Sequence, residues 1–234
     1  MPNSMSDLLW EEALRHRVTL SHNQVEQLLF HLNLVRRWQK SAVRLVGSDE
    51  PVKLVGEHVA DAFSIYHCIN RWKGKNLIDI GSGAGFPGLC LKIVEPELQL
   101  TLLEASAKKA AFLAKAKSEL ALEDVEIVRG RAEKLAHEVG LREQFDLATL
   151  RAVANLTKSI GTGLPFVRVG GSLVIARGRT SGADAETARD VGQSMGAGQV
   201  VVHSGSLAGA PLRGSIMVFR KTEPADRCCG REGT

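Results

Sequence analysis

The first 75 residues carry apolar positions at the spacing of amphipathic helices. Val25, Leu28 and Leu32 recur three and four residues apart, which places them on one face of a helix. Ser21 and Gln24 stand just before them with the spacing of a capping box. Further helices are predicted over residues 7–16 and 51–70, with an irregular link over 40–50. We therefore expect residues 1–75 to form an N-terminal helical extension.

From residue 76 onward, short apolar segments of strand length alternate with helical patterns. This alternation predicts βαβ units and an α/β fold whose parallel sheet is doubly wound, over residues 76–222. The last two strands lie close together, so we expect them to form an antiparallel hairpin at one edge, joined through residues 205–211. The predicted strands cover residues 76–80, 99–104, 124–128, 145–150, 171–176, 199–204 and 214–220, and helices between them include 107–120 and 183–195.

A glycine-dense turn follows the first of these strands. Gly81, Gly83 and Gly85 lack a Cβ, so the backbone can adopt positive φ and approach a ligand closely. Pro87 suits the first turn of the helix that follows. The dinucleotide fingerprint needs glycine at the sixth position of the turn, where this chain has Phe86. The pattern predicts a nucleotide-like cofactor, with NAD and a simple loop as the alternatives.

Two carboxylates favour S-adenosylmethionine as that cofactor. Asp79 directly precedes the glycine turn, where a carboxylate suits the sulfonium cation better than a phosphate. Glu104 ends the second strand about 20 residues beyond the turn, the usual place of a ribose-binding carboxylate. We expect Glu104 to bind the ribose hydroxyls.

The ends of the third and fourth strands border the same crevice in an open α/β sheet. Ala132 and Glu133 are predicted to lie beside the adenine, although Arg131 and Glu133 could instead form an exposed pair at a helix start. Arg151 is expected to enter the cleft and position substrate or cofactor, with a structural salt bridge as the alternative. No Asn/Asp-Pro-Pro-aromatic segment and no Pro-Cys pair follows the fourth strand. An acceptor with a free lone pair, such as guanine N7, needs neither a base nor a cysteine.

The histidines show no arrangement typical of a metal site or a catalytic triad. His58 and Asp61 lie one helical turn apart and can share a face. An internal hydrogen bond is favoured for His58, and a pair facing the cleft stays open. His16, His22 and His31 are predicted to lie at the surface, and no metal is expected.

Composition adds little to this interpretation. The chain has 30 basic and 26 acidic side chains, a net charge of +4 that is compatible with a polyanionic partner without requiring one. The four cysteines, Cys68, Cys90, Cys228 and Cys229, have no zinc or disulfide spacing and are expected to be reduced. Residues 223–234 are predicted to be disordered. Without a signal peptide or a membrane span, the cytoplasm is the expected location, and a monomer is favoured.

The assembled motifs resemble the ribosomal RNA small subunit methyltransferase G family. The resemblance spans roughly residues 25 to 180. Its motifs are Glu57-His58-Val59-Ala60-Asp61, the turn from Asp79 to Gly88, Leu102-Leu103-Glu104-Ala105, the Lys108-Lys109 and Phe112-Leu113 pairs, Arg131-Ala132-Glu133 and Arg151-Ala152. The turn running into Phe86-Pro87-Gly88 is the most specific of these.

The resemblance implies an S-adenosylmethionine-dependent methyltransferase with a class I, Rossmann-like sheet. It implies methylation of guanine N7 in the decoding-region loop of 16S ribosomal RNA, at guanine 527 in the usual numbering, with the RNA or the small ribosomal subunit as partner. Carried over by position, Gly81, Phe86, Ala132, Glu133 and Arg151 would contact or border the cofactor. A methyltransferase for another RNA or a small molecule, and an RNA-associated cofactor-binding module without catalysis, are the alternatives.

The chain departs from the family pattern in two places. Residues 43–46 read Val-Arg-Leu-Val where the family usually has Asn-Leu-Thr, which leaves RNA contacts there open. Arg177 replaces a common lysine after the fifth strand and keeps its charge. Arg36, Arg37, Lys40 and Arg44 could form an RNA-facing surface or an ordinary solvated helix face.

Overall fold

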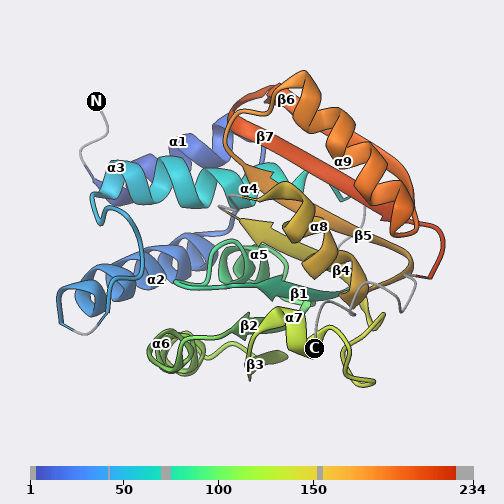
Figure 1. The fold of residues 1–234 in the computed structure, drawn as a ribbon. Coiled ribbons are helices and arrows are strands. Elements are labelled where there is room, and N and C mark those ends of the chain that lie inside the picture. Colours follow the sequence, from blue (N-terminus) through green and yellow to red (C-terminus); the bar gives the residue numbers. More distant parts are fainter. Residues whose placement is uncertain (1–3, 42, 70–74, 152–154, 225–234) are drawn as a thin grey trace.

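A seven-stranded sheet forms the centre of the computed structural model, which describes residues 4–41, 43–69, 75–151 and 155–224 (Figure 1). The strand order is β3-β2-β1-β4-β5-β7-β6. The strands are β1 Asn76–Ile80, β2 Gln99–Glu104, β3 Val125–Arg129, β4 Phe145–Arg151, β5 Val167–Arg177, β6 Ala197–Leu207 and β7 Ala210–Lys221. All seven predicted strands are present.

The pairing of the strands confirms the doubly wound fold. β1 pairs in parallel with both β2 and β4, and β3 and β5 extend the parallel sheet on either side. β7 runs antiparallel to β5 and β6, which completes the predicted edge hairpin. Strand order reverses between β1 and β4, so a crevice opens there at the carboxyl ends of the strands.

The turn of the edge hairpin is shorter than predicted. β6 continues to Leu207 and β7 begins at Ala210, so most of residues 205–211 belongs to the strands. Gly205 and Gly209 adopt positive φ, and a register shift between Ser204 and Ser206 accommodates two extra residues of β7. The pairing thus continues through glycines that the sequence pattern assigned to a loop.

The helices occur where the sequence predicts them. The described helical elements are α1 Met5–Arg15, α2 His22–Ser41, α3 Pro51–Lys53, the π-helix η1 Leu54–Val59, α4 Ala60–Tyr66, α5 Gly88–Val94, α6 Ala107–Glu119, α7 Ala132–Leu135, α8 Leu156–Gly163, the 3₁₀-helix η2 Leu164–Phe166 and α9 Gly182–Ser194. The capping box of α2 is confirmed: the Gln24 amide donates to Ser21 Oγ at 3.2 Å, and the Ser21 amide donates to Gln24 Oε1 at 2.8 Å. Within the described ranges, no helix is long and apolar enough to span a bilayer.

The helices cover both faces of the sheet. α4, α5 and α6 lie on one face, and α7, α8 and α9 lie on the other (Figure 1). The first face shares its apolar core with the N-terminal helices, because Leu28 and Leu32 of α2 are buried in the same cluster as Leu89 and Leu102. The helical extension therefore adds a further layer to one side of the sheet.

Two of the three histidines predicted at the surface are buried instead. His22 is exposed, whereas the exposed fractions of His16 and His31 are 1% and 0%. His16 Nε2 lies 2.9 Å from Glu12 Oε1 within α1, so a hydrogen bond satisfies the buried ring. The prediction is wrong because it considered only that histidine is polar and not where each histidine lies along its helix. His31 stands three residues from Leu28, on the apolar side of α2.

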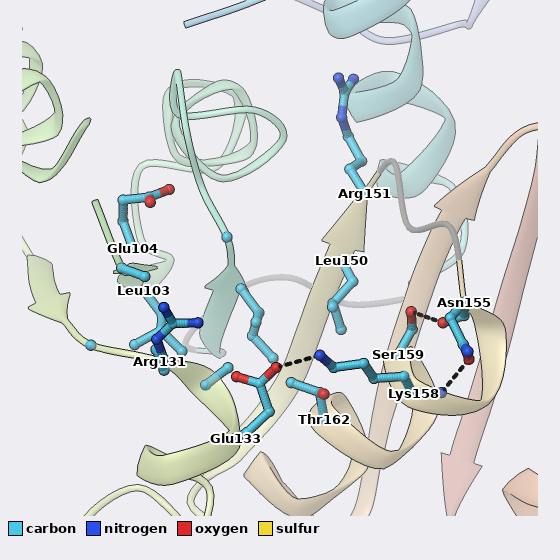
Figure 2. A pocket seen from close by; sticks show the side chains of 15 residues that line it. Leu103, Glu104, Arg131, Glu133, Leu150, Arg151, Asn155, Lys158, Ser159 and Thr162 are labelled. Carbon is cyan, nitrogen blue, oxygen red and sulfur yellow. Dashed lines mark hydrogen bonds and ion pairs between the residues drawn. The ribbon is translucent and has the colours of Figure 1, made fainter. Parts of the chain in front are cut away.

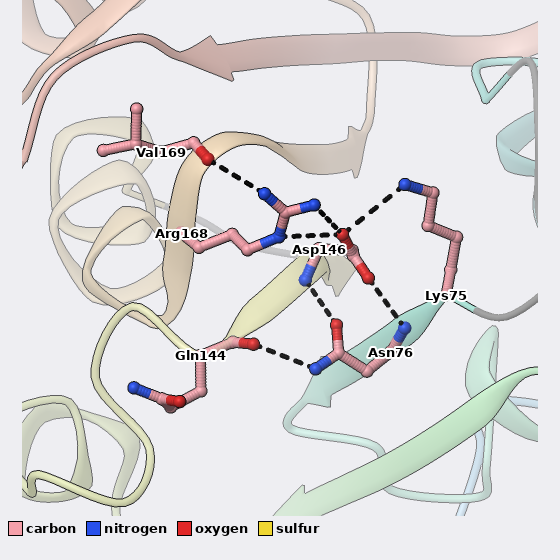
Figure 3. A network of polar contacts seen from close by, with 6 residues as sticks. All are labelled: Lys75, Asn76, Gln144, Asp146, Arg168 and Val169. Carbon is pink, nitrogen blue, oxygen red and sulfur yellow. Dashed lines mark hydrogen bonds and ion pairs between the residues drawn. The ribbon is translucent and has the colours of Figure 1, made fainter.

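A network of polar contacts joins the strands at their amino ends. Asp146 of β4 accepts hydrogen bonds from Arg168 Nε at 2.9 Å and from the Asn76 amide at 3.1 Å, and Lys75 Nζ lies 3.5 Å from the same carboxylate (Figure 3). The Asn76 side chain in turn accepts from the Asp146 amide and donates to the Gln144 carbonyl. These contacts hold β1, β4 and β5 together at the end of the sheet away from the crevice.

Replacing Phe112 with alanine tests whether the extension and the sheet share one core. Phe112 of α6 is fully buried and contacts the Trp38 ring of α2 at a centroid distance of 5.7 Å. We expect Phe112→Ala to lower the free energy of unfolding by about 3–5 kcal/mol. Urea titration of this variant and of Val139→Ala, whose side chain is 92% exposed, provides the comparison. A loss below about 1 kcal/mol would contradict the shared core.

Candidate functional site

A cavity of about 460 Å³ opens at the carboxyl ends of the central strands. The turns after β1, β2 and β3 and the start of α8 form its walls (Figure 2). The lining residues are Ile80, Gly81, Leu103, Glu104, Ala105, Gly130, Arg131, Ala132, Glu133, Leu150, Arg151, Asn155, Lys158, Ser159 and Thr162. Apolar and polar side chains both line it, a combination suited to a small ligand with a flat ring and polar substituents.

The glycine turn adopts backbone conformations that favour glycine. Gly81, Gly83 and Gly85 have φ values of +74°, +56° and +83°, in the left-handed region. Gly85 also lacks space for a side chain, because a Cβ there would lie 2.4 Å from Leu89 Cδ1. Gly81 lines the cavity, while Gly83 and Gly85 are not among the lining residues.

Glu104 holds the glycine turn and lines the cavity at the same time. Its Oε2 accepts from the Gly83 amide at 2.9 Å, and its Oε1 accepts from the Ser106 amide at 2.8 Å. Each carboxylate oxygen has more than one acceptor site, so these bonds leave capacity for a hydroxyl donor from the cavity. The carboxylate is therefore positioned by backbone before any ligand arrives.

Asp79 lies beneath the turn rather than in the cavity wall. Its Oδ1 accepts from the Thr149 hydroxyl at 2.9 Å, and its Oδ2 accepts from the Gly88 amide at 3.2 Å. Burial raises the pKa of Asp79 to about 6, against the opposing effect of these hydrogen bonds. The carboxylate joins β1, β4 and the start of α5, and it is not among the lining residues.

Phe86 is enclosed between two histidines from the helical extension. The His58 ring stacks on it at a centroid distance of 4.9 Å and an angle of 15°, and the His31 ring lies 4.9 Å away. His31 Nε2 is 2.8 Å from the Ala84 carbonyl, so α2 is hydrogen-bonded directly to the glycine turn. Phe86 thus packs beside the turn and does not line the cavity.

Arg151 borders the cavity and forms an ion pair with the helical extension. Its Nη1 donates to Asp61 Oδ2 at 2.9 Å, and its Nη2 donates to His58 Nδ1. Figure 2 shows the guanidinium directed away from Glu133 and Lys158. The structural salt bridge that the sequence left as an alternative is present between Arg151 and Asp61, and His58, which stacks on Phe86, accepts a hydrogen bond from the same arginine.

The far wall of the cavity combines the start of α7 with the start of α8. Ala132 and Glu133 both line it, and Glu133 Oε1 lies 3.1 Å from Lys158 Nζ. Asn155 caps α8 by accepting from the Lys158 amide at 2.9 Å (Figure 2). Glu133 therefore forms its ion pair with a residue of α8. Arg131 and Glu133 are also both exposed at the start of α7, as the alternative interpretation expected, and the pKa of Glu133 is lowered by a backbone hydrogen bond and, to a smaller extent, by the Arg131 charge.

The structure brings five of the predicted site residues to one cavity: Gly81, Glu104, Ala132, Glu133 and Arg151. Sequence reasoning missed His31, which its place among apolar residues of α2 could have revealed. It also missed Lys158 and its neighbours on α8, for which the sequence carries no motif. Ala152, Cys228 and Cys229 lie outside the described residues.

Comparison with known proteins identifies the relatives of the chain. The family model for rRNA small subunit methyltransferase G matches residues 24–210. A protein named ribosomal RNA small subunit methyltransferase G from Caldanaerobacter subterraneus subsp. tengcongensis is 40% identical over 76% of this chain and 74% of its own length. Its namesake from Roseiflexus castenholzii is 36% identical over 93% and 92%.

Solved structures show the same fold at low sequence identity. A crystal structure described as an S-adenosyl-L-methionine-dependent methyltransferase from Methanococcus maripaludis has a TM-score of 0.55 with 17% identity. The match covers 73% of this chain and 90% of that one. The sheet is thus a Rossmann-like methyltransferase sheet.

The buried His31 ring predicts a dependence of stability on acid pH. Burial lowers the pKa of His31 to about 4, against the opposing hydrogen bond to Ala84. Between pH 6.5 and 4 the unfolded chain therefore binds a proton that the folded chain does not, and the free energy of unfolding falls as the pH decreases. We expect a loss on the order of 3 kcal/mol from this residue.

Urea titrations across this pH range measure the effect. His31→Gln should reduce the slope without abolishing it, because burial also lowers the pKa of His58, to about 3; His22→Gln, at an exposed site of the same helix, is the control. Equal slopes for His31→Gln and the unsubstituted protein would contradict the assignment.

Proposed function

Because the chain belongs to the ribosomal RNA small subunit methyltransferase G family, whose cofactor is S-adenosyl-L-methionine, we propose that it methylates guanine N7 in the decoding-region loop of 16S ribosomal RNA. The observation that carries the proposal is the cavity at the β1–β4 crevice, bordered by Glu104, Glu133 and Arg151. The substrate is the RNA or the small ribosomal subunit, and the reaction takes place in the cytoplasm.

The cavity suits the cofactor in shape and chemistry. The carboxylate of Glu104 is placed to accept hydrogen bonds from the two ribose hydroxyls, as the charged acceptor at the end of β2. Ala132 and Glu133 would flank the adenine, with Leu103 and Leu150 beneath it. The bound cofactor supplies a methyl group activated by attachment to a sulfonium.

The acceptor chemistry agrees with a cavity that holds no nucleophilic thiol. None of the lining residues, all in the described part of the chain, is a cysteine; burial raises the pKa of Cys90 to about 12. Guanine N7 needs no such group, because its lone pair forms the new C–N bond while the C–S electron pair returns to sulfur. No proton leaves the base, so alignment supplies the catalysis.

Arg151 is proposed as a positioning residue at the edge of this site. Its bonds to Asp61 and His58 fix the guanidinium between the end of β4 and the helical extension. An incoming base or phosphate would meet an arginine whose orientation is already determined. The neutral His58 ring accepts from this arginine, since burial and then the Arg151 charge lower its pKa to about 3.

Methyl transfer to purified small ribosomal subunits and to their stripped RNA tests the proposed reaction directly. We expect 7-methylguanine in the decoding-region loop when the RNA is digested and its nucleosides are identified by mass spectrometry. Methylation of another base, or of small metabolites alone, would point to a different methyltransferase. Cofactor binding with no methylated product would point to a non-catalytic module.

Arg151→Lys tests the positioning role. Lysine keeps the charge but cannot donate to Asp61 and His58 in the same fork geometry. We expect kcat to fall about 100-fold, with a smaller change in cofactor affinity. Arg168→Lys is the matched control, because Arg168 also pairs with an aspartate but at the opposite end of the strands. Equal kcat values for the two variants would exclude the role.

Glu104→Gln tests the ribose contact. Glutamine keeps one acceptor oxygen and loses the charge, so we expect the cofactor Kd to rise about 10- to 100-fold. Isothermal titration calorimetry measures this, with Glu186→Gln on the exposed side of α9 as the control. An unchanged Kd would mean that Glu104 only supports the glycine turn.

A further inference from the structure

One exposed stripe of α2 is basic and carries an aromatic ring. Phe30, Asn33, Arg37 and Lys40 are all exposed and recur at spacings of three and four residues, so they lie along one face of the helix. With Arg36 they line a hollow of about 400 Å³. This hollow is distinct from the cofactor cavity, with which it shares no lining residue.

The chemistry of the hollow matches a nucleic-acid strand. Among the described residues, its lining holds three cationic side chains and no acidic one; the nearest acidic residue on the stripe is Glu26, one turn before Phe30. The guanidinium carbon of Arg37 lies 5.8 Å from the centre of the Phe30 ring, a cation–π contact. Such a pair offers a flat platform for a base beside positive charge for phosphates.

The helix end that carries the charges is fixed in place. Arg36 Nε donates to the Asp49 carbonyl at 3.1 Å, and the Gln39 side chain accepts from the amides of Leu45 and Val46 at 3.1 and 2.8 Å. The segment that departs from the family pattern, residues 43–46, is thus held against α2 by its backbone. The side chains of Leu45 and Val46 are also buried in the core cluster that contains Leu32 and Val35 of α2.

The helix that carries the stripe also contacts the glycine turn. His31, next to Phe30 in sequence, is hydrogen-bonded to Ala84 of the glycine turn. At 1.5 Å per residue, Arg37 and Lys40 lie about 9 and 14 Å along the helix from that contact. About three or four stacked nucleotides span this separation.

We propose that Phe30, Arg36, Arg37 and Lys40 of α2 bind an unpaired segment of the substrate RNA that adjoins the acceptor guanine. The phosphates contact the three cations, and a base stacks on the platform of Phe30 and Arg37. This inference rests on the proposed function, since it takes the acceptor to be a base in a single-stranded loop of RNA.

Salt-dependent RNA binding tests the phosphate contacts. The probe is a fluorescently labelled RNA hairpin with the decoding-region loop, titrated with the full chain at several salt concentrations. For the double variant Arg37→Gln/Lys40→Gln we expect the slope of log K against log salt to shrink by about 1.4, at about 0.7 per phosphate contact on a single strand. Its cofactor affinity should be unchanged, because neither residue lines the cofactor cavity.

A matched charge control and an aromatic substitution complete the test. Arg189→Gln/Arg220→Gln removes the same charge from exposed sites on α9 and β7 and should retain the original slope. Phe30→Leu should weaken RNA binding about tenfold with an unchanged slope, because it removes stacking and no charge.

Three outcomes would overturn the proposal. The first is equal behaviour of the two charge variants. The second is RNA binding by Phe30→Leu as tight as that of the unsubstituted chain, which would leave a phosphate surface without a stacked base. The third is loss of binding to anionic lipid vesicles in the α2 variants while RNA binding persists.

The same measurements separate this inference from the proposed function. If 7-methylguanine forms and the α2 variants bind and methylate RNA normally, the α2 surface is wrong while the function stands. If RNA binding depends on Arg37 and Lys40 but another base is methylated, the surface stands and the assigned reaction is wrong.

Discussion

The buried carboxylate of Asp79 is the contact on which the site depends. It joins β1 to the Gly88 amide at the start of α5, the next element along the chain, and to the Thr149 hydroxyl of β4, which is 70 residues away. A Cβ at position 88 would lie 2.8 Å from the same carboxylate oxygen, so the helix can approach only through a glycine. The hydrogen bonds of the buried Asp79 carboxylate therefore fix the positions of β1, β4 and the start of α5, and so the shape of the crevice above them.

The helical extension participates in the site as well as in the core. His31 contacts the glycine turn from α2, and His58 packs on Phe86 from the π-helical segment. Phe86 is thereby fixed between rings from two helices, and Arg151 is bonded to the same segment as His58. A π-helical turn changes the direction in which the following side chains of the helix face. Glu57 and His58, both in the π-helical segment, contact residues at the carboxyl end of the sheet.

Two different regions of the molecule are proposed to bind the cofactor and the RNA. Glu104 and the α7–α8 wall line the cavity proposed for the cofactor, while the basic stripe of α2 lines a separate hollow. The His31 contact connects the two regions. Binding of RNA on α2 would therefore act on a helix that already touches the cofactor turn, which brings the acceptor to the donor without a separate domain.

Much of the architecture could be predicted from the sequence, because alternating apolar segments and caps are local signals. The strand positions, the capping box at Ser21 and the grouping of Gly81, Glu104 and Arg151 at one edge follow from periodicity and from the geometry of parallel sheets. The hairpin turn was predicted over too many residues, because glycines within paired strands give the same sequence signal as glycines in a loop. His31 was misplaced since a polar residue on an apolar face needs a partner that only packing supplies.

The sequence by itself determined the fold class, the glycine turn and the family, because each rests on short local patterns and on their order along the chain. Only the tertiary structure decided what the charged groups contact. Asp79 lies beneath the glycine turn, Arg151 forms an ion pair with Asp61, and Glu133 forms an ion pair with Lys158. These partners come from segments up to 90 residues apart, and the free energy of burying a charge selects them only after the helices and strands have packed.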